Sequence, residues 1–173
     1  MIYDIAIIGA GMAGASLAAE LAPHASVLLL EAEDAPGYHA TGRSAAFWEE
    51  CYGGPGVVPL TLASGGYLDD HGFLTPRGAL FIGRAGDRAA MDAHVATFAG
   101  TGVITHRLSP AELAAKVPHI RPEWSEALHQ PACADIDVAG LHQHYLGAAR
   151  RHGVTTACRA RVSGLVREGG AWT

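Results

Sequence analysis

The feature that most constrains the fold of this chain is a glycine-rich turn between two short regular segments. The continuous apolar run Ile5–Ile8 leads directly into the motif Gly-x-Gly-x-x-Gly at residues 9–14, and small and apolar side chains dominate residues 13–21. The run is typical of a parallel strand buried on both faces, and the small residues predict a helix packed closely on it. A second apolar run at residues 26–30 predicts a second strand. The chain therefore begins with a β-α-β unit of the α/β class.

Each glycine of this motif has a physical role in binding a dinucleotide. Gly9 permits a tight turn, Gly11 lets a pyrophosphate approach the backbone, and Gly14 lets the helix approach the strand. The N-terminus of the helix offers unpaired N–H groups and a partial positive charge to the phosphates. Glu31 ends the second strand, where an acid would accept hydrogen bonds from ribose hydroxyls and disfavour a 2′-phosphate. The unit predicts a ligand of the FAD or NAD type, and the alternative is a glycine-rich turn without a ligand.

The segment after Glu31 favours FAD over NAD. A nicotinamide enzyme normally continues into another crossover and strand, whereas residues 36–46 form a loop of small residues and backbone donors ahead of a predicted short helix at residues 44–52. Such a loop can lie along an extended FAD. Arg43 and Ser44 would stand at the start of that helix, where two polar donors suit an anion; the alternative is that they are ordinary turn residues.

The remainder of the chain alternates helical and strand patterns. Residues 53–56, Gly-Gly-Pro-Gly, form a strong break, and a loop-rich stretch lies between Pro118 and Pro131. The patterns predict helices at residues 57–68 and 87–98, a helix that starts after its cap Ser109, and a helix at residues 138–152 capped by Asp137. They predict strands at residues 79–82, 103–107, 155–157 and 160–166, and a hairpin turn at residues 169–170.

Composition excludes several classes of protein. Of 173 residues, 49% are hydrophobic and 17% are charged, which is a globular composition, and the apolar runs are far shorter than the roughly 20 residues of a transmembrane helix. The net charge is −5 and the basic residues are scattered, so we expect no nucleic-acid partner and no membrane span. The N-terminus shows no signal-peptide pattern, which favours a cytoplasmic protein.

Cysteine and histidine spacing does not indicate a metal site. Cys51, Cys133 and Cys158 are far apart and form no ligand motif, so we expect buried free thiols in a reducing compartment. Packing or solvated roles are expected for His94, His106, His142, His144 and His152.

Several motifs together resemble the family of FAD-dependent amino-acid oxidases and dehydrogenases. The resemblance rests on residues 4–14 and Glu31, on residues 37–46, on Tyr52-Gly53 and on the later run 134–146. The D-amino-acid dehydrogenase branch, and D-arginine dehydrogenase-like enzymes in particular, are most similar. The motifs are specific within the first 53 residues and at residues 134–146, and they are weak between these two segments.

The resemblance implies a fold, a reaction and a domain order. It implies a Rossmann-like FAD-binding domain at residues 1–53 and 135–173, interrupted by part of an α+β substrate domain at 54–134, with the C-terminal half of the fold absent from this chain. It implies oxidation of an amino acid or amine, a small-molecule substrate, by hydride transfer from the substrate Cα to flavin N5. Two alternatives stay open: oxidation of a 2-hydroxy acid on the same scaffold, and an FAD-binding fragment without turnover that lacks a C-terminal partner half.

The resemblance also implies residue roles. Tyr52 matches a tyrosine of a mobile active-site loop, and the alternative is a core tyrosine. The adenine would meet the backbone of Val162, within the predicted strand 160–166. Further FAD contacts are implied at Ala13, Glu31, Ala32, Ala40, Thr41, Gly42, Arg43, Ser44, Ala45, Ala46 and Phe47.

Three positions depart from the D-arginine dehydrogenase pattern. Phe47 and Glu49 stand where that branch has a histidine and a threonine near the flavin, and Ala79 stands where it has a glutamate that meets a basic side chain. These departures favour an apolar or otherwise different amino acid or amine as the substrate. Glu49 would meet a substrate cation, or else it is an exposed helical glutamate.

Overall fold

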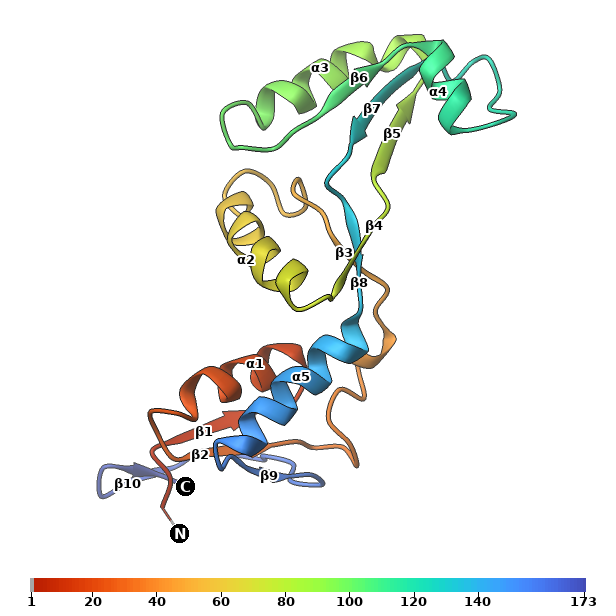
Figure 1. The fold of residues 1–173 in the computed structure, drawn as a ribbon. Helices are drawn as coiled ribbons and strands as arrows, with labels where there is room; N and C mark the ends of the chain where they lie inside the picture. Colours follow the sequence, from red (N-terminus) through yellow and green to blue (C-terminus); the bar gives the residue numbers. More distant parts are fainter. Residues whose placement is uncertain (1) are drawn as a thin grey trace. The chain divides into compact units, whose positions relative to one another are not determined.

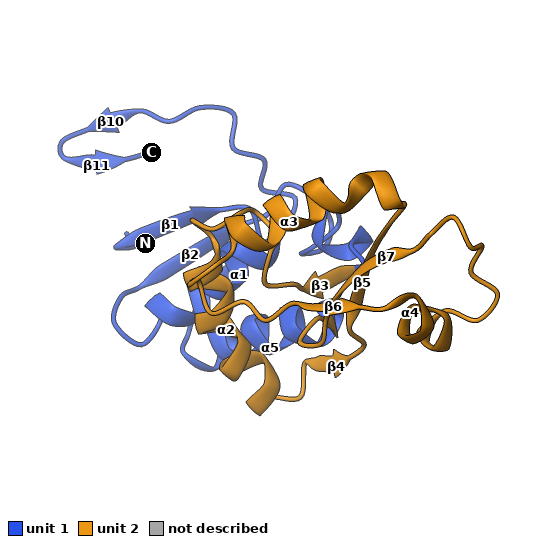
Figure 2. Cartoon of the chain, turned by 90° about the horizontal axis from the view of Figure 1, so that it is seen from above, with its two compact units in different colours: residues 1–45, 137–173 blue, residues 46–136 orange. Residues whose placement is uncertain are grey.

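The computed structural model describes residues 2–173, which form two compact units (Figure 2). Unit 1 contains the residues up to Ala45 together with Asp137–Thr173, and unit 2 contains Ala46–Ile136. The chain therefore leaves unit 1, builds unit 2, and returns. The division falls at Ala45/Ala46 and at Ile136/Asp137.

Unit 1 is built on a parallel three-stranded sheet in the order β1-β2-β9, formed by Ile5–Ile8, Val27–Leu30 and Thr155–Ala157. Helices α1 (Met12–Leu21) and α5 (Val138–Arg151) pack on one face of this sheet (Figure 1). The short helix η1 (Thr41–Arg43) follows β2, and a hairpin of β10 (Arg167–Glu168) and β11 (Ala171–Trp172) ends the unit. Its core consists of Ile7, Ala10, Ala18, Ala19, Val27, Leu29 and Ala149.

Only one face of this sheet is covered in the described residues. Ile7 is buried against the helices, whereas its neighbour Ile8 is 57% exposed on the opposite face. The prediction that this strand is buried on both faces is therefore wrong for unit 1, because α1 and α5 both pack on the same side.

Unit 2 contains two antiparallel three-stranded sheets and three helices. The first sheet has the order β3-β8-β4, formed by Ala46–Trp48, Ala134–Ile136 and Leu74–Pro76. The second has the order β5-β7-β6, formed by Ala79–Gly83, Glu126–Gln130 and His106–Leu108. The helices are α2 (Val58–Asp70), α3 (Arg88–Thr97), which follows the short η2 (Ala85–Asp87), and α4 (Pro110–Lys116).

Most of the predicted elements are confirmed. The β-α-β unit forms with both strands parallel, the helices at α2, α3 and α5 lie within two residues of their expected bounds, and the hairpin at residues 169–170 is present. Ser109 caps α4 as predicted, since its hydroxyl accepts the Glu112 N–H and the Glu112 carboxylate accepts the Ser109 N–H. The strand predicted at residues 103–107 forms at His106–Leu108.

Two predicted elements are wrong. The segment predicted as a helix at residues 44–52 is instead the strand β3, because Ala46, Phe47 and Trp48 pair with β8 from a distant part of the chain. The strand predicted at residues 160–166 does not form; the chain there has no ladder partner and runs as an irregular segment from Ala160 into the hairpin.

No helix among residues 2–173 is both long and apolar enough to span a bilayer. The same residues contain no group of three or more His, Cys, Asp or Glu side chains that could hold a metal ion. Cys51 and Cys133 are buried, Cys158 is half-buried, and all three are free thiols.

Candidate functional site

The glycine motif forms a tight connection between β1 and α1. Gly9 adopts a φ of +97°, which L side chains rarely adopt, and its N–H donates to the Leu30 carbonyl at 2.7 Å. Gly14 lies against the Gly9 carbonyl so closely that a Cβ at residue 14 would overlap that oxygen. The expected roles of these two glycines in the turn and in the helix approach are therefore present in the structure.

Glu31 is tied to the glycine motif through its carboxylate. One oxygen, Oε2, accepts the Ala10 N–H at 2.9 Å, and the other, Oε1, accepts the Glu33 N–H at 3.0 Å. The Glu33 N–H is the main reason that the pKa of Glu31 lies below its usual value; burial opposes this, and the N–H groups of Ala10 and Ala32 assist it. Glu31 is therefore held ionised beside the motif, and each oxygen keeps acceptor capacity for a hydroxyl.

The first turn of α1 is assembled together with Thr41. The Thr41 hydroxyl oxygen accepts the Met12 N–H at 2.9 Å. The first helical hydrogen bond of α1 runs from the Ala15 N–H to the Gly11 carbonyl. A Cβ on Gly11 would lie 3.1 Å from Thr41 Oγ1. Thr41 is thus brought beside the motif from η1 and accepts one N–H group of the helix N-terminus. The other N–H groups of the first turn are those that a helix N-terminus offers to phosphate.

These residues fit the adenosine and pyrophosphate end of a dinucleotide. Gly11 and Gly14 stand at the helix N-terminus, Ala13 is exposed at its first turn, and an ionised carboxylate stands at the end of the neighbouring strand. Ala32 follows that carboxylate and is half-buried. Small residues, unpaired N–H groups and a hydroxyl acceptor are the chemistry that this class of ligand requires.

The loop before η1 differs from the expectation for Arg43 and Ser44. They do not begin a helix: Arg43 is the last residue of η1, and Ser44 follows it in an extended conformation. The Ser44 hydroxyl donates to the Ala40 carbonyl at 2.7 Å, and the Arg43 guanidinium lies over the Tyr38 ring at 5.3 Å. The helix-start argument for anion binding by these two side chains is therefore wrong, because the following residues pair into β3.

The implied FAD-contacting run is divided between the two units. Ala40, Thr41, Gly42, Arg43, Ser44 and Ala45 lie in unit 1, whereas Ala46 and Phe47 lie in β3 of unit 2. Tyr52 is also in unit 2, in the turn after β3, and it is 79% exposed. The alternative that Tyr52 is a core residue is therefore wrong.

Val162 lies in an irregular segment rather than in the predicted strand. That segment is nevertheless fastened to the end of β2, because the Ala160 N–H donates to the Glu31 carbonyl at 2.8 Å and the Arg159 N–H donates to the Glu33 carbonyl at 2.9 Å. Val162 is half-buried two residues further on. Its backbone is therefore near the strand end that carries Glu31.

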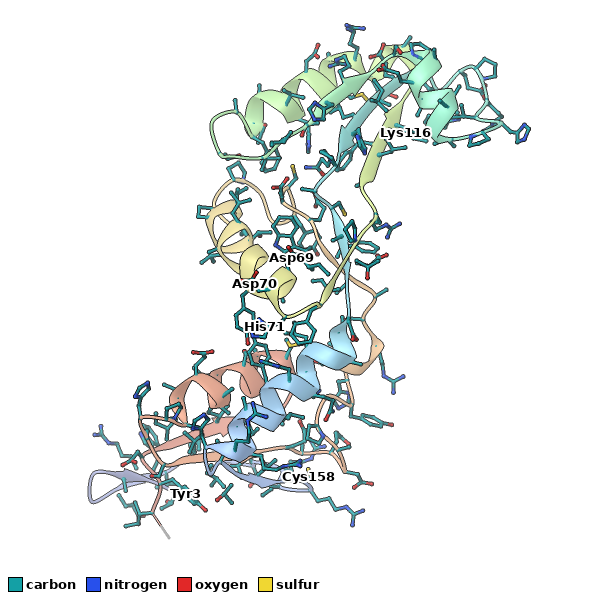
Figure 3. The ribbon with its side chains drawn as sticks, in the orientation of Figure 1. Tyr3, Asp69, Asp70, His71, Lys116 and Cys158 are labelled. Carbon is teal, nitrogen blue, oxygen red and sulfur yellow. The ribbon has the colours of Figure 1, made fainter. Side chains whose placement is uncertain are left out.

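Unit 2 contains a cavity of about 510 Å³. Some of the residues that line it stand out in the sequence, but the sequence did not predict that they line one cavity. The guanidinium of Arg77 lies 4.5 Å from the centre of the Phe47 ring and forms an ion pair with Asp135 at 3.1 Å. Lys116, the last residue of α4, contributes a second cation (Figure 3). The cavity is lined by Phe47, Glu49, Arg77, Gly78, Ala79, Leu80, Lys116, His129 and Cys133.

This cavity unites the three positions at which the sequence departs from the D-arginine dehydrogenase pattern. Phe47, Glu49 and Ala79 all line it, although they come from β3, from the turn after it and from β5. Glu49 is half-buried and accepts the Cys51 N–H at 3.0 Å, so the alternative of an exposed helical glutamate is wrong. Burial lowers the pKa of His129, and Lys116 and His106 act in the same direction, which favours the neutral imidazole.

His142 has the packing role that the sequence predicts as one alternative, but its contact with the glycine motif was not predicted. It is 4% exposed on α5, and its Nε2 lies 2.8 Å from the Ala10 carbonyl oxygen. The periodicity of α5 carries the signal, since Leu141, His142 and Ala149 form its buried face. A histidine on a buried stripe needs a hydrogen-bond partner, and here the partner is the glycine motif.

Comparison with known proteins decides the family. The family model described as "FAD dependent oxidoreductase" matches residues 4–173. The chain belongs to the FAD-dependent oxidoreductase family. The predicted cofactor, FAD, is therefore the cofactor of its family, and the α/β fold with a Rossmann-like unit is the fold of its structural neighbours.

Solved structures of other members of this fold superpose on the chain. L-α-glycerophosphate oxidase from Mycoplasma pneumoniae with FAD bound has a TM-score of 0.88 at 17% identity, covering 98% of this chain and 48% of that one. Glycine oxidase from Geobacillus kaustophilus superposes with a TM-score of 0.84 at 21% identity, covering 98% of this chain and 50% of that one. L-proline dehydrogenase from P. horikoshii superposes with a TM-score of 0.81 at 21% identity, covering 95% of this chain and 46% of that one. The chain spans about half the length of each of these three proteins.

Proposed function

We propose that this chain belongs to an enzyme of the D-amino-acid dehydrogenase type, which oxidises an amino acid or amine by hydride transfer from the substrate Cα to flavin N5. Unit 1 would be the FAD-binding portion, and unit 2 would be part of the substrate-binding portion. The observation that carries the proposal is the Glu31 carboxylate bonded to the Ala10 N–H beside the glycine-rich N-terminus of α1. Together with the family match, this arrangement supports a dinucleotide cofactor in unit 1.

Specific residues of unit 1 would hold the cofactor. Glu31 would accept the ribose hydroxyls, and the N–H groups at Gly11, Ala13 and Gly14 would face the pyrophosphate. Thr41 would close the same turn, since its hydroxyl already accepts the Met12 N–H. When bound, FAD supplies a flavin ring that accepts a hydride from the substrate.

The lining of the unit 2 cavity supports a substrate whose side chain is not cationic. A guanidinium substrate needs a carboxylate at its tip, and Ala79 stands where the similar branch has one. The cavity contains Arg77 and Lys116 as cations and a single carboxylate, Glu49. Cations repel a basic side chain and favour a neutral or acidic one. Glu49 is then available for a substrate amine.

The chemistry needs position and water exclusion more than a strong acid or base. Hydride transfer proceeds when the substrate amine is neutral and its Cα is held against the cofactor. Tyr52 is exposed and stands next to Gly53 and Gly54, which both have positive φ. We therefore assign Tyr52 to a loop that closes over bound substrate.

Flavin binding and flavin reduction test the proposal in two steps. The purified chain is loaded with FAD and passed through a gel-filtration column, and we expect a yellow protein with one FAD per chain. The loaded protein, and the same chain co-expressed with any downstream coding segment, are then mixed without oxygen with D-amino acids, sarcosine and 2-hydroxy acids. Bleaching near 450 nm by an amine or amino acid is the expected result.

Other outcomes separate the alternatives. Bleaching only by 2-hydroxy acids would replace amine oxidation with alcohol oxidation on this scaffold. Bound FAD that no substrate reduces in either preparation would leave an FAD-binding module without turnover. A folded chain that stays colourless with FAD in excess would overturn the proposal at its first step.

A further inference from the structure

The imidazole of His142 contacts two separate loops of the candidate cofactor site. Its Nε2 lies 2.8 Å from the Ala10 carbonyl oxygen in the glycine motif. Its ring also packs against Gly37 in the loop before η1, where a Cβ would lie 2.8 Å from His142 Cε1. All three residues belong to unit 1. A side chain from α5, late in the chain, therefore joins two segments from its beginning.

The hydrogen bond fixes the protonation of the ring nitrogen. The Ala10 carbonyl oxygen accepts only, so His142 Nε2 must carry the hydrogen. Ala10 is fully buried, and its own N–H donates to the Glu31 carboxylate at 2.9 Å. The N–H and the carbonyl of Ala10 are therefore both bonded to side chains: the N–H to Glu31, directly after β2, and the carbonyl to His142 of α5. This sets the orientation of the backbone directly before Gly11.

The contact with Gly37 orients the second loop. Gly37 is buried with a φ of +79°, and its carbonyl accepts the Gly42 N–H at 2.7 Å. That turn places Thr41, whose hydroxyl accepts the Met12 N–H at the start of α1. The ring of His142 therefore supports the Thr41 side of the helix N-terminus as well as the Ala10 side.

We propose that His142 is a positioning residue for the pyrophosphate of the cofactor: it holds the Ala10 and Gly37 segments so that the α1 N-terminus is preorganised for the phosphates. His142 does not itself bind the ligand. Glu31, the proposed ribose partner, is also held by the Glu33 N–H at 3.0 Å, so we expect the effect of His142 to fall on ligands that carry the pyrophosphate. This inference rests on the FAD binding proposed for unit 1.

Three ligands and three variants test the role. FAD, ADP and adenosine share the adenosine group, and only the first two carry the pyrophosphate. His142→Phe keeps a ring of similar size without the donor, His142→Gln restores an N–H near the Nε2 position, and His152→Phe is the control at the exposed C-cap of α5. Dissociation constants are measured by fluorescence or calorimetry, and folding is checked by far-ultraviolet circular dichroism.

We expect His142→Phe to raise the dissociation constants of FAD and ADP by the same factor, about tenfold or more. The dissociation constant of adenosine should stay within about twofold of the parent value. His142→Gln should recover most of the loss, and His152→Phe should bind all three ligands like the parent chain. A uniform loss for all three ligands would show a general structural role and would overturn the proposal, as would parent-like FAD binding by His142→Phe.

Two further controls keep the result interpretable. If His142→Phe does not fold, the comparison is made between His142→Gln and His142→Asn, whose amide is too short to reach the Ala10 carbonyl; equal ADP affinity in these two variants would overturn the proposal. If the parent chain binds neither FAD nor ADP, the proposed function itself fails, which is a distinct outcome from parent binding with no effect of His142.

Discussion

The Glu31 carboxylate accepts the Ala10 N–H at 2.9 Å, so the end of β2 is bonded to the turn that opens α1. This bond joins the residue expected to bind ribose to the loop expected to bind pyrophosphate. It also keeps a negative charge close to the site of a negatively charged ligand. The N–H groups of Ala10 and Glu33 offset that charge, and they hold the pKa of Glu31 below its usual value.

Glu31→Gln is expected to weaken FAD binding and to remove a pH dependence of folding. The loss of the ribose acceptor should raise the FAD dissociation constant about tenfold, since a hydrogen bond to a charged group is worth roughly 1.5–3 kcal/mol. A carboxyl whose folded pKa is lowered stabilises the protein above its unfolded pKa of 4.5, and this stability is lost as the pH falls through the lower folded value.

Urea unfolding between pH 7 and about pH 3.5 checks the predicted pH dependence of stability. The difference in unfolding free energy between the parent chain and Glu31→Gln should be largest at pH 7 and should shrink below pH 4.5. Glu20→Gln, an exposed position of α1, should show no such trend. An equal difference at both ends of the pH range would contradict the assignment.

Gly14→Ala is expected to damage both stability and FAD binding. The added methyl would overlap the Gly9 carbonyl oxygen, so α1 must move away from β1. Overpacking of this kind costs about 1–3 kcal/mol, and the shift should raise the FAD dissociation constant more than tenfold. Thermal unfolding and FAD titration measure the two effects.

Gly147→Ala is the matched control within the same unit. Gly147 lies inside α5, and the nearest atom to an added Cβ is the flexible Arg151 Nη1 at 3.4 Å. Alanine in a helix interior is more favourable than glycine by about 0.5–1 kcal/mol. This variant should therefore be at least as stable as the parent chain and should bind FAD equally well. A Gly14→Ala variant that behaved like Gly147→Ala would contradict the close-approach argument.

The elements predicted from sequence are those with a clear local pattern of residues. The β1-α1-β2 unit and the Ser109 cap depend on residues close together in the chain, and each formed as expected. The strands β3 and β8 were missed because each depends on the other: Ala46 pairs with Ile136, far away in sequence. β7 was missed because Pro118 and Pro131 suggested a loop, although neither proline lies within the strand.

The candidate site divides in the same way. The glycine motif and Glu31 could be located from spacing alone, because one β-α-β unit brings them together. His142 and the unit 2 cavity could not, since both arise from pairings and packing between distant segments. Arg43 and Ser44 were expected at the start of a helix over residues 44–52, but Ala46–Trp48 pair with β8 instead.

Ala79→Glu is expected to change the substrate preference of the proposed enzyme. A carboxylate at this position would enter the cavity that Phe47 and Glu49 line, and it would attract a cationic side chain there. We expect the ratio of kcat/KM for D-arginine to that for D-alanine to rise about tenfold, equivalent to about 1.4 kcal/mol. Ala89→Glu, on the exposed surface of α3, should leave the ratio unchanged. An unchanged ratio in both variants would separate this cavity from substrate selection.

Glu50 is expected to destabilise unit 2 as the pH rises. Its side chain is buried, Oε2 has no hydrogen-bond partner among residues 2–173, and burial raises its pKa above 4.5. The folded unit therefore binds a proton more tightly than the unfolded chain, and its stability falls as the pH rises from 4.5 through the folded value. Glu50→Gln should flatten this slope in urea unfolding followed by tryptophan fluorescence, whereas the exposed control Glu123→Gln should retain it.

Cys51 is expected to be the least reactive of the three thiols. Burial, with help from Glu49, raises its pKa to about 11, and the Gln130 amide donates to its sulfur at 2.7 Å. Because the thiolate is the reactive form, alkylation of Cys51 at pH 7.5 should require unfolding. Cys158 is half-buried in unit 1 and should react first with iodoacetamide, as located by peptide mass spectrometry. Cys158→Ser should remove the fast phase and leave the slow phase unchanged; rapid labelling of Cys51 in the folded chain would contradict its burial.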